Sequence, residues 1–558
     1  MVKKLLNFFH KEINGLHEAA YLLGFFALLC QLLALVRDRV LAATFGAGHD
    51  LDIYYSAFRI PDFIFVMVAS LVGISVLVPF IIEKANISKE ESKKFIDNIF
   101  SAFFLLIIII SGIVFIFTPY LVPLIFKGFP LKDFPELIFL TRILLLSPIL
   151  LGLSNFFGSI TQVYKRFVIY SISPMVYNLG IIFGILALQP VFGLRGVVYG
   201  VILGALLHLL IQIPFVIKQG MFPKFKVNFD WPEIKKVITL SIPRTFTLGI
   251  VQITTIFLIA MATFMKDGSV AIFNFSINMQ SVTLSIIGVS YSIAAFPTLA
   301  RFFAEKQTGK FLAEIITSAR HIIFWSIPIS VLFIVLRAQV VRTILGSGEF
   351  NWDNTRLTAA ALALFSFSAL AQGLILLFVR GYYAMGNTKK PLIIGSISGF
   401  LIIIFSYLFV KLFASYAVFQ YFIESLFRVG GIEGTSVLML PLGYSLGIFI
   451  NCILLWACFA REFAGFSRPL WGTLFHTFSA SVIMGAVSYL GLNIFNSLFN
   501  LNTTFGIFMQ GFLAGMMGII AGIIVLKLLK NRELEEIWIT LHHKIWKVKP
   551  LPADITEI

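Results

Sequence analysis

Apolar runs long enough to cross a lipid bilayer recur along this chain, and no other feature constrains its fold as strongly. A hydrocarbon core of about 30 Å needs a helix of about 20 apolar residues. Backbone polar groups in lipid must be satisfied within the segment, so each run is expected to be a helix. We find fourteen such runs, at approximately 20–45, 52–83, 97–124, 137–163, 168–188, 194–217, 237–264, 270–300, 314–345, 355–385, 391–412, 436–460, 470–495 and 505–529.

These runs predict an all-α polytopic membrane protein with about fourteen transmembrane helices. The composition agrees, because 59% of the residues are hydrophobic and only 13% are charged, which excludes an ordinary soluble protein. The net charge of +16 does not indicate nucleic-acid binding, because the basic residues lie in alternate loops instead of one patch. Such loops face the cytoplasm. Both termini are therefore predicted to be cytoplasmic, which requires an even number of spans.

Short sequence echoes predict that the chain contains an internal repeat. Pro79 near the end of the second run is echoed by Pro297, 218 residues later. Tyr164 is echoed by Tyr383 at nearly the same offset. A Gly-x-x-x-Gly pair ending at Gly200 is echoed by one ending at Gly447, and the longer offset there fits an inserted segment. Six spans are an even number, so the two halves would share an orientation and be related by an axis along the membrane normal, as in parallel-repeat transporters.

The repeat predicts two six-helix lobes, related by a pseudo-two-fold along the membrane normal, followed by two extra C-terminal helices. The predicted parts are an amphipathic cytoplasmic segment at 1–18, an N-lobe at 19–217, a C-lobe at 235–460 with an external interfacial insertion near 413–435, spans 13 and 14 at 469–530, and a basic cytoplasmic tail at 531–558.

The first two spans carry ionisable residues in their interiors. Arg37 and Asp38 lie in the first span, and Asp52, Arg59 and Asp62 share one face of the second. A charge within a membrane span is costly, so it normally faces the protein interior or a wet cavity. Two interpretations stay open at this point. The residues form a structural ion-pair cluster, or they bind an anionic substrate.

Three further ionisable residues lie within later spans. Arg142 is near the outer end of span 4, where snorkelling to the interface is favoured over function. Arg244 follows a proline at the cytoplasmic start of span 7 and is a further candidate for substrate binding. His208 in span 6 is more typical of a hydrogen-bonded core histidine than of a proton relay.

Motifs of energy-coupled or hydrolytic enzymes are absent from the sequence. Gly309-Lys310 lacks the upstream glycine and the Ser or Thr of a phosphate-binding loop. There is no His-Glu-x-x-His motif and no Gly-x-Ser-x-Gly elbow. Cys30, Cys452 and Cys458 fall in apolar segments without disulfide or metal-ligand spacing. We therefore predict a transporter and not an enzyme, with no ATP site, cofactor or metal.

Several motifs occur in this chain in a characteristic order. They are Arg37-Asp38, Phe45-Gly46-Ala47-Gly48, Ala57-Phe58-Arg59-Ile60-Pro61, Tyr164-Lys165-Arg166-Phe167, Pro243-Arg244, Gly348-x-Phe350 and Tyr383-Ala384-x-x-Asn387-Thr388-Lys389-x-Pro391. In these the chain resembles the MurJ (MviN) family of lipid II flippases, within the multidrug/oligosaccharidyl-lipid/polysaccharide exporter superfamily. The resemblance covers spans 1–12.

The resemblance implies two lobes around a central cavity that opens alternately to either side of the bacterial cytoplasmic membrane. It implies that spans 13 and 14 form a groove for the polyprenyl tail of the substrate. Arg37, Asp38 and Asp52 match positions that the family uses, and Arg59 stands in place of a lysine. The implied substrate is lipid II, whose pyrophosphate these cations would hold. Membrane lipids and the cell-wall synthesis machinery are the other implied partners, and nucleic acid is not.

The chain departs from the family at three positions where an arginine is expected. Gln31, Phe65 and Asn278 stand there instead. Phosphate binding is then redistributed to Arg59 and Arg244, or the substrate is another polyprenyl-pyrophosphate-linked glycan. A third alternative is a scaffold of the cell-wall machinery that transports nothing.

Overall fold

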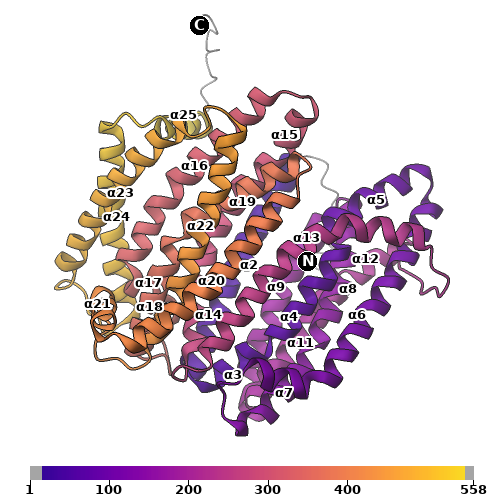
Figure 1. The fold of residues 1–558 in the computed structure, drawn as a ribbon, viewed down its shortest axis with the longest axis horizontal. Coiled ribbons are helices and arrows are strands. Elements are labelled where there is room, and N and C mark those ends of the chain that lie inside the picture. The colour runs from indigo at the N-terminus through magenta and orange to yellow at the C-terminus, as the bar shows by residue number, and fades with distance from the viewer. Residues whose placement is uncertain (1–15, 547–558) are drawn as a thin grey trace, which may run out of the picture. The chain divides into compact units, whose positions relative to one another are not determined.

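The computed structural model describes residues 16–546, and within that range every regular element is a helix (Figure 1). Twelve helical segments are long and apolar enough to cross a membrane, and the pair α18 (Trp352–Phe367) and α19 (Ala369–Ala384), bent by 41°, makes a thirteenth. The first predicted run is occupied by α2 (Leu16–Phe45), a helix of 30 residues. All fourteen predicted runs therefore lie on helices, and the all-α membrane fold is confirmed.

The helices of the first half follow the predicted spans closely. After α2 they are α3 (His49–Ala57), α4 (Arg59–Ile64), α5 (Ile74–Ile87), α6 (Lys89–Ile125), α7 (Phe134–Leu144), α8 (Leu146–Val163), α9 (Phe167–Phe183), α10 (Gln189–Phe192), α11 (Leu194–Leu210) and α12 (Ile213–Lys218).

The second half continues with longer helices joined by short loops. They are α13 (Trp231–Ala262), α14 (Ser269–Leu284), α15 (Ser290–Ala304), α16 (Thr308–Val335), α17 (Arg337–Leu345), α18, α19, α20 (Lys389–Ser415), α21 (Ala417–Phe427), α22 (Met439–Glu462), α23 (Arg468–Phe495), α24 (Thr504–Leu528) and α25 (Arg532–Trp546).

Local breaks interrupt several spans, and two of them recur at the offset of the predicted repeat. In span 2 a π-helical turn at Phe65–Ala69 and a 3-10 turn at Ser70–Val72 separate α4 from α5. In span 8 a π-helical turn at Ser285–Val289 separates α14 from α15. These two π-turns lie 220 residues apart, close to the 218 residues between Pro79 and Pro297. The recurrence of the break supports the internal repeat.

Contacts divide the chain into two compact units. The first contains the residues up to Met279 together with Ile344–Ala361 and Thr388–Gly447, and the second contains Gln280–Thr343, Leu362–Asn387 and Ile448–Ile558. The boundaries fall inside α14, α17, α18 and α22. The lobe bounds expected from the repeat stay a prediction.

The Gly-x-x-x-Gly segment of span 6 lets two helices of the first unit approach closely. A Cβ added to Gly200 on α11 would lie 2.4 Å from the Cα of Gly184, at the end of α9. Backbone contact of this kind is how small residues bring membrane helices together. The glycine is therefore required by packing and not by backbone conformation.

We expect Gly200→Ala to destabilise the protein by about 2 kcal/mol, because the two backbones must separate to admit the methyl group. Thermal unfolding in detergent measures this. The matched control is Gly395→Ala on α20, where an added Cβ meets no atom within 4 Å. Equal unfolding temperatures for the two variants would contradict the close-packing argument.

The predicted insertion near 413–435 contains a helix, α21, as expected. Its apolar side chains Val418, Tyr421, Phe422 and Leu426 are exposed, which suits a helix lying at the membrane surface. Placement on the external side stays a prediction. The amphipathic segment expected at 1–18 lies almost wholly outside the described residues.

The predicted basic tail begins with a helix that sequence reasoning did not foresee, and a buried ion pair holds it to the second unit. Glu533 on α25 accepts hydrogen bonds from Arg320 of α16 at 2.6 Å and from Thr473 of α23 at 2.7 Å. Leu534 and Ile537 pack against the apolar cluster of Phe324, Ala480 and Leu526. The helix is thus docked by one carboxylate and two leucine-type contacts.

Docking of α25 is expected to weaken as the pH falls. Burial raises the pKa of Glu533, but the Thr473 hydroxyl and the Arg320 charge outweigh burial and hold the pKa below its ordinary value. A carboxylate with a lowered folded-state pKa stabilises the fold above its unfolded pKa, about 4.3. That stabilisation is lost as the pH falls through the folded-state pKa. Hydrogen exchange of α25 amides should therefore accelerate below about pH 4, whereas Glu533→Gln should exchange fast with little pH dependence beyond the intrinsic one.

Candidate functional site

Arg37 and Asp38 of α2 form an ion pair between neighbouring residues. The Arg37 Nε and Nη2 atoms donate to Asp38 Oδ1 at 3.0 and 2.7 Å. The Asp38 side chain is almost fully buried, and 21% of the Arg37 side chain is exposed. One guanidinium edge is therefore engaged by the aspartate while part of the group stays accessible.

Two asparagines from distant helices complete this pair. Arg37 Nη1 donates to the Asn178 side-chain oxygen on α9 at 3.0 Å. The Asn278 amide nitrogen on α14 donates to Asp38 Oδ2 at 3.2 Å. Asn178 also contacts the sulfur of Cys30, so Cys30 and Arg37 lie on one face of α2, as their spacing predicted. The polar groups of α2 are thus fixed from both sides.

Arg59 is held by a second asparagine of the same helix α14. Its Nη2 atom donates to the Asn274 side-chain oxygen at 2.5 Å, and its Nε atom donates to the Tyr55 carbonyl at 3.1 Å. Asn274 and Asn278 are four residues apart, which places them on one helical face. That face of α14 therefore contacts both Arg59 and Asp38.

Tyr55 lies between the two arginines. Its phenol is close enough to Asp38, Arg37 and Arg59 to interact with all three charges. Its hydroxyl is buried and has no hydrogen-bond partner in the described part of the chain. The charges predicted for a common cavity thus converge around one tyrosine, and its hydroxyl is available to a ligand.

Asp52 sits in a different environment from the arginines. Its two carboxylate oxygens accept hydrogen bonds from the backbone nitrogens of Gly268 at 2.7 Å and Ala271 at 2.8 Å. These nitrogens belong to the first turn of α14, where unpaired N–H groups and the helix dipole favour an anion. Asp52 therefore caps the helix that carries the two asparagines. Its expected contact with substrate stays a prediction.

The two remaining candidates are less clearly placed. Asp62 lies three residues from Arg59 and makes no hydrogen bond or ion pair with any described residue. Arg244 on α13 lies beside the break in span 2, with its Nη1 atom next to Gly73. The neighbouring Thr245 hydroxyl is 2.7 Å from the Ser70 hydroxyl of the same break. Both residues stay predictions as substrate contacts. His208 is hydrogen-bonded to Ser154 at 2.6 Å, the core role expected for it.

Sequence reasoning missed Asn274 and gave no role to Asn178 in the charge cluster. The usable signal was the spacing of Asn274 and Asn278, a polar pair four residues apart within an apolar span. Asn278 stands where the family would have an arginine, and here it binds the carboxylate of Asp38. An amide at this position pairs with an anion but adds no positive charge.

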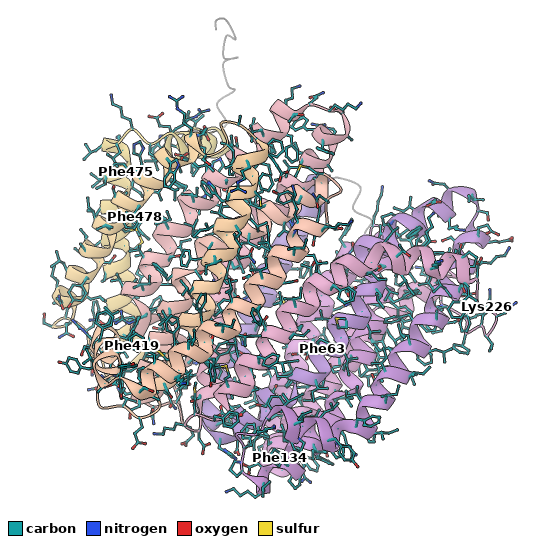
Figure 2. The ribbon with its side chains drawn as sticks, in the orientation of Figure 1. Phe63, Phe134, Lys226, Phe419, Phe475 and Phe478 are labelled. Atoms are coloured by element: carbon teal, nitrogen blue, oxygen red, sulfur yellow. The ribbon has the colours of Figure 1, made fainter. Side chains whose placement is uncertain are left out.

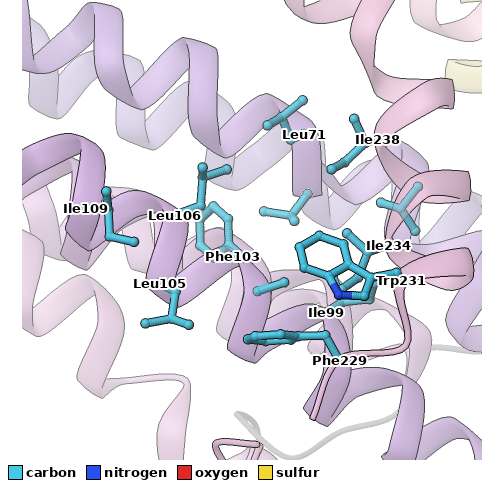
Figure 3. A pocket seen from close by; sticks show the side chains of 13 residues that line it. Leu71, Ile99, Phe103, Leu105, Leu106, Ile109, Phe229, Trp231, Ile234 and Ile238 are labelled. Atoms are coloured by element: carbon cyan, nitrogen blue, oxygen red, sulfur yellow. The ribbon is translucent and has the colours of Figure 1, made fainter. Parts of the chain in front are cut away.

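A separate pocket in the first unit is almost wholly apolar. It has a volume of about 290 Å³ and lies between α6 and the start of α13, lined by residues such as Phe103, Leu106, Trp231 and Ile234 (Figure 3). None of its lining residues is charged. It therefore suits hydrocarbon and not the anion that the arginine cluster would bind.

Known proteins identify the family. The family model described as "Lipid II flippase MurJ" matches residues 41–509, which is most of the chain. The chain belongs to the MurJ family. It is 26% identical over 389 residues to the probable lipid II flippase MurJ of Haemophilus influenzae, covering 66% of this chain and 76% of that protein. It is 23% identical over 389 residues to the lipid II flippase MurJ of Burkholderia cenocepacia, covering 68% and 75%.

Solved structures support the same fold. A lipid II flippase MurJ in an inward closed conformation aligns with a TM-score of 0.71 at 21% identity, over 93% of this chain and all of that one. An inward-facing multidrug transporter of the same exporter superfamily aligns with a TM-score of 0.63 at 14% identity, over 78% and 96%. The MurJ family and the exporter superfamily expected from the motifs are confirmed, and with them a multi-pass transporter architecture.

Proposed function

We propose that this protein is a lipid II flippase of a bacterial cytoplasmic membrane. It moves the polyprenyl-pyrophosphate-linked peptidoglycan precursor from the inner to the outer leaflet by alternating access. Membership of the MurJ family supports the transport reaction. The observation that carries the substrate assignment is the convergence of Arg37 and Arg59 around the unpaired hydroxyl of Tyr55.

The proposed substrate contact is the pyrophosphate. Guanidinium groups bind phosphate oxygens through paired N–H donors, and such charge-assisted bonds are stronger than neutral ones. In the substrate-free cluster Asp38 occupies one edge of Arg37, and Asn274 occupies Arg59. Pyrophosphate would compete with these oxygens for the same donors. Competition of this kind lets the site release the anion on the outer side when the internal partners return.

The energy source and the path of the lipid tail follow from the same proposal. The substrate is anionic, so the membrane potential favours its outward movement, and the sequence has no ATP site. The polyprenyl tail would lie along α23 and α24, which pack against each other. Phe475 and Phe478 project from α23 and are 68% and 60% exposed, as suits a surface in contact with hydrocarbon (Figure 2). Both termini would lie in the cytoplasm.

The decisive experiment measures lipid II at the outer surface of cells depleted of their own flippase and supplied with this protein. Restored exposure is expected for the native chain and for Arg195→Gln. Arg195 pairs with Glu136 on the protein surface, so this control removes a positive charge outside the cluster. No restoration by a well-inserted native chain would overturn the proposal.

A second candidate substrate is another polyprenyl-pyrophosphate-linked glycan. It is favoured by Gln31, Phe65 and Asn278, which stand where the family has arginines. Exposure of such a glycan, with no exposure of lipid II, would select this alternative while leaving the phosphate site intact.

A further inference from the structure

An apolar groove on the surface of the first unit contains one arginine. It lies between α6 and the α7–α8 segment and has a volume of about 510 Å³. Its lining includes Ile108, Gly112, Phe139 and Leu146. Ile108 and Leu146 are 39% and 50% exposed, so the groove opens on the lipid-facing surface. Span 4 starts on the side that the loop charges predict to be external, which places the groove toward the outer leaflet.

Arg142 supplies the only charge among the described residues that line this groove. Its Nε atom donates to the Phe115 carbonyl at 3.2 Å, and its guanidinium carbon lies 4.8 Å from the centre of the Phe115 ring. These contacts fix the group and leave its Nη atoms without a protein acceptor among the described residues. A cation held in this way at the edge of hydrocarbon requires an anion, and the protein does not provide one.

Ser111 adds a second polar group to the groove. Its side chain is 4% exposed and lines the same cavity as Arg142. In the described structure its hydroxyl has no hydrogen-bond partner. A buried hydroxyl without a partner costs free energy, so it points to an acceptor that a ligand would bring. The groove thus offers a cation, a hydroxyl donor and an apolar channel.

We propose that this groove binds a glycerophospholipid of the outer leaflet. Its phosphodiester lies on the Nη atoms of Arg142, an ester oxygen accepts from Ser111, and one acyl chain lies along Ile108, Gly112 and Leu146. Arg195, one helical region away, does not need such a ligand, because Glu136 already pairs with it at 2.6 Å. The proposal concerns a bound structural lipid and does not depend on which lipid the protein transports.

The test uses the full-length protein in detergent with phosphatidylglycerol as the added lipid, and native mass spectrometry to count retained lipid molecules. Two variants address the two halves of the site. Arg142→Gln removes the cation, and Gly112→Leu fills the apolar channel. An added Cβ at Gly112 meets no atom within 4 Å, and leucine favours a helix over glycine, so this variant should fold. Arg195→Gln is the matched control, and unfolding temperatures verify that each variant is intact.

The native protein and Arg195→Gln are expected to retain one more phosphatidylglycerol than either groove variant. The expected loss of affinity in Arg142→Gln is about tenfold, typical of one charge-assisted hydrogen bond. Diacylglycerol, which lacks the phosphate, should bind no better to the native protein than to Arg142→Gln. Equal retention of phosphatidylglycerol by the native protein and Arg142→Gln, or undiminished retention by Gly112→Leu, would overturn the proposal.

Discussion

Arg37→Ala is expected to reduce lipid II exposure at the cell surface by at least about a hundredfold, and the double variant Arg37→Ala/Asp38→Ala is expected to stay inactive. The lost contact is a bidentate, charge-assisted bond to the pyrophosphate, worth about 3 kcal/mol. Exposure is measured in flippase-depleted cells, with every variant at matched membrane abundance.

The double variant separates the two interpretations that the sequence left open. Arg37→Ala alone strands the buried Asp38 carboxylate, which keeps only Asn278 as a partner. Breaking a buried pair in this way costs about 3–5 kcal/mol, so the single variant could fail for structural reasons. Removing Asp38 as well eliminates that cost. Recovery of transport in the double variant would therefore show that the pair is structural and that Arg37 does not hold the substrate.

Arg37→Lys sharpens this result. Lysine keeps the charge but has one donor group in place of the planar fork that contacts both Asp38 and Asn178. We expect transport to fall to an intermediate level, about tenfold below that of the native chain. Full activity in Arg37→Lys would mean that charge alone suffices at this position.

Asp52→Ala is expected to lower the free energy of unfolding by about 3 kcal/mol, because two buried backbone N–H groups lose a charged acceptor. The first turn of α14 cannot replace the carboxylate from its own side chains. Gly268, one of the two donors, has φ +91° and packs its Cα against the Ala47 carbonyl, so the turn has little freedom to rearrange. Thermal unfolding in detergent measures the loss.

Asp50→Ala is the matched control for this variant. Asp50 lies on the same helix α3 but is exposed to the surroundings. Its replacement should leave the unfolding temperature within about 1 °C of the native value, as is usual for a surface change. An Asp52→Ala protein that is as stable as the control yet inactive would instead support the substrate contact that the family resemblance implied.

The sequence by itself determined the class of the protein and the number of its spans. Hydropathy is a local property, because a helix in lipid satisfies its own backbone and needs only enough apolar residues in a row. The spacing of Asp52, Tyr55, Arg59 and Asp62 predicted a shared face for the same reason. The motifs then identified the family, since they preserve residue types and order even where overall identity is low.

The tertiary structure alone decided which partners these charges have. Asn178 lies 141 residues from Arg37, and Asn274 lies 215 residues from Arg59. No periodicity within one helix predicts contacts between helices so far apart, because those contacts depend on how the helices pack. The same holds for Asp52, which looks like the other charges in the sequence but caps α14 in the fold. Its role was set by the backbone N–H groups of a distant helix, and local sequence carries no record of them.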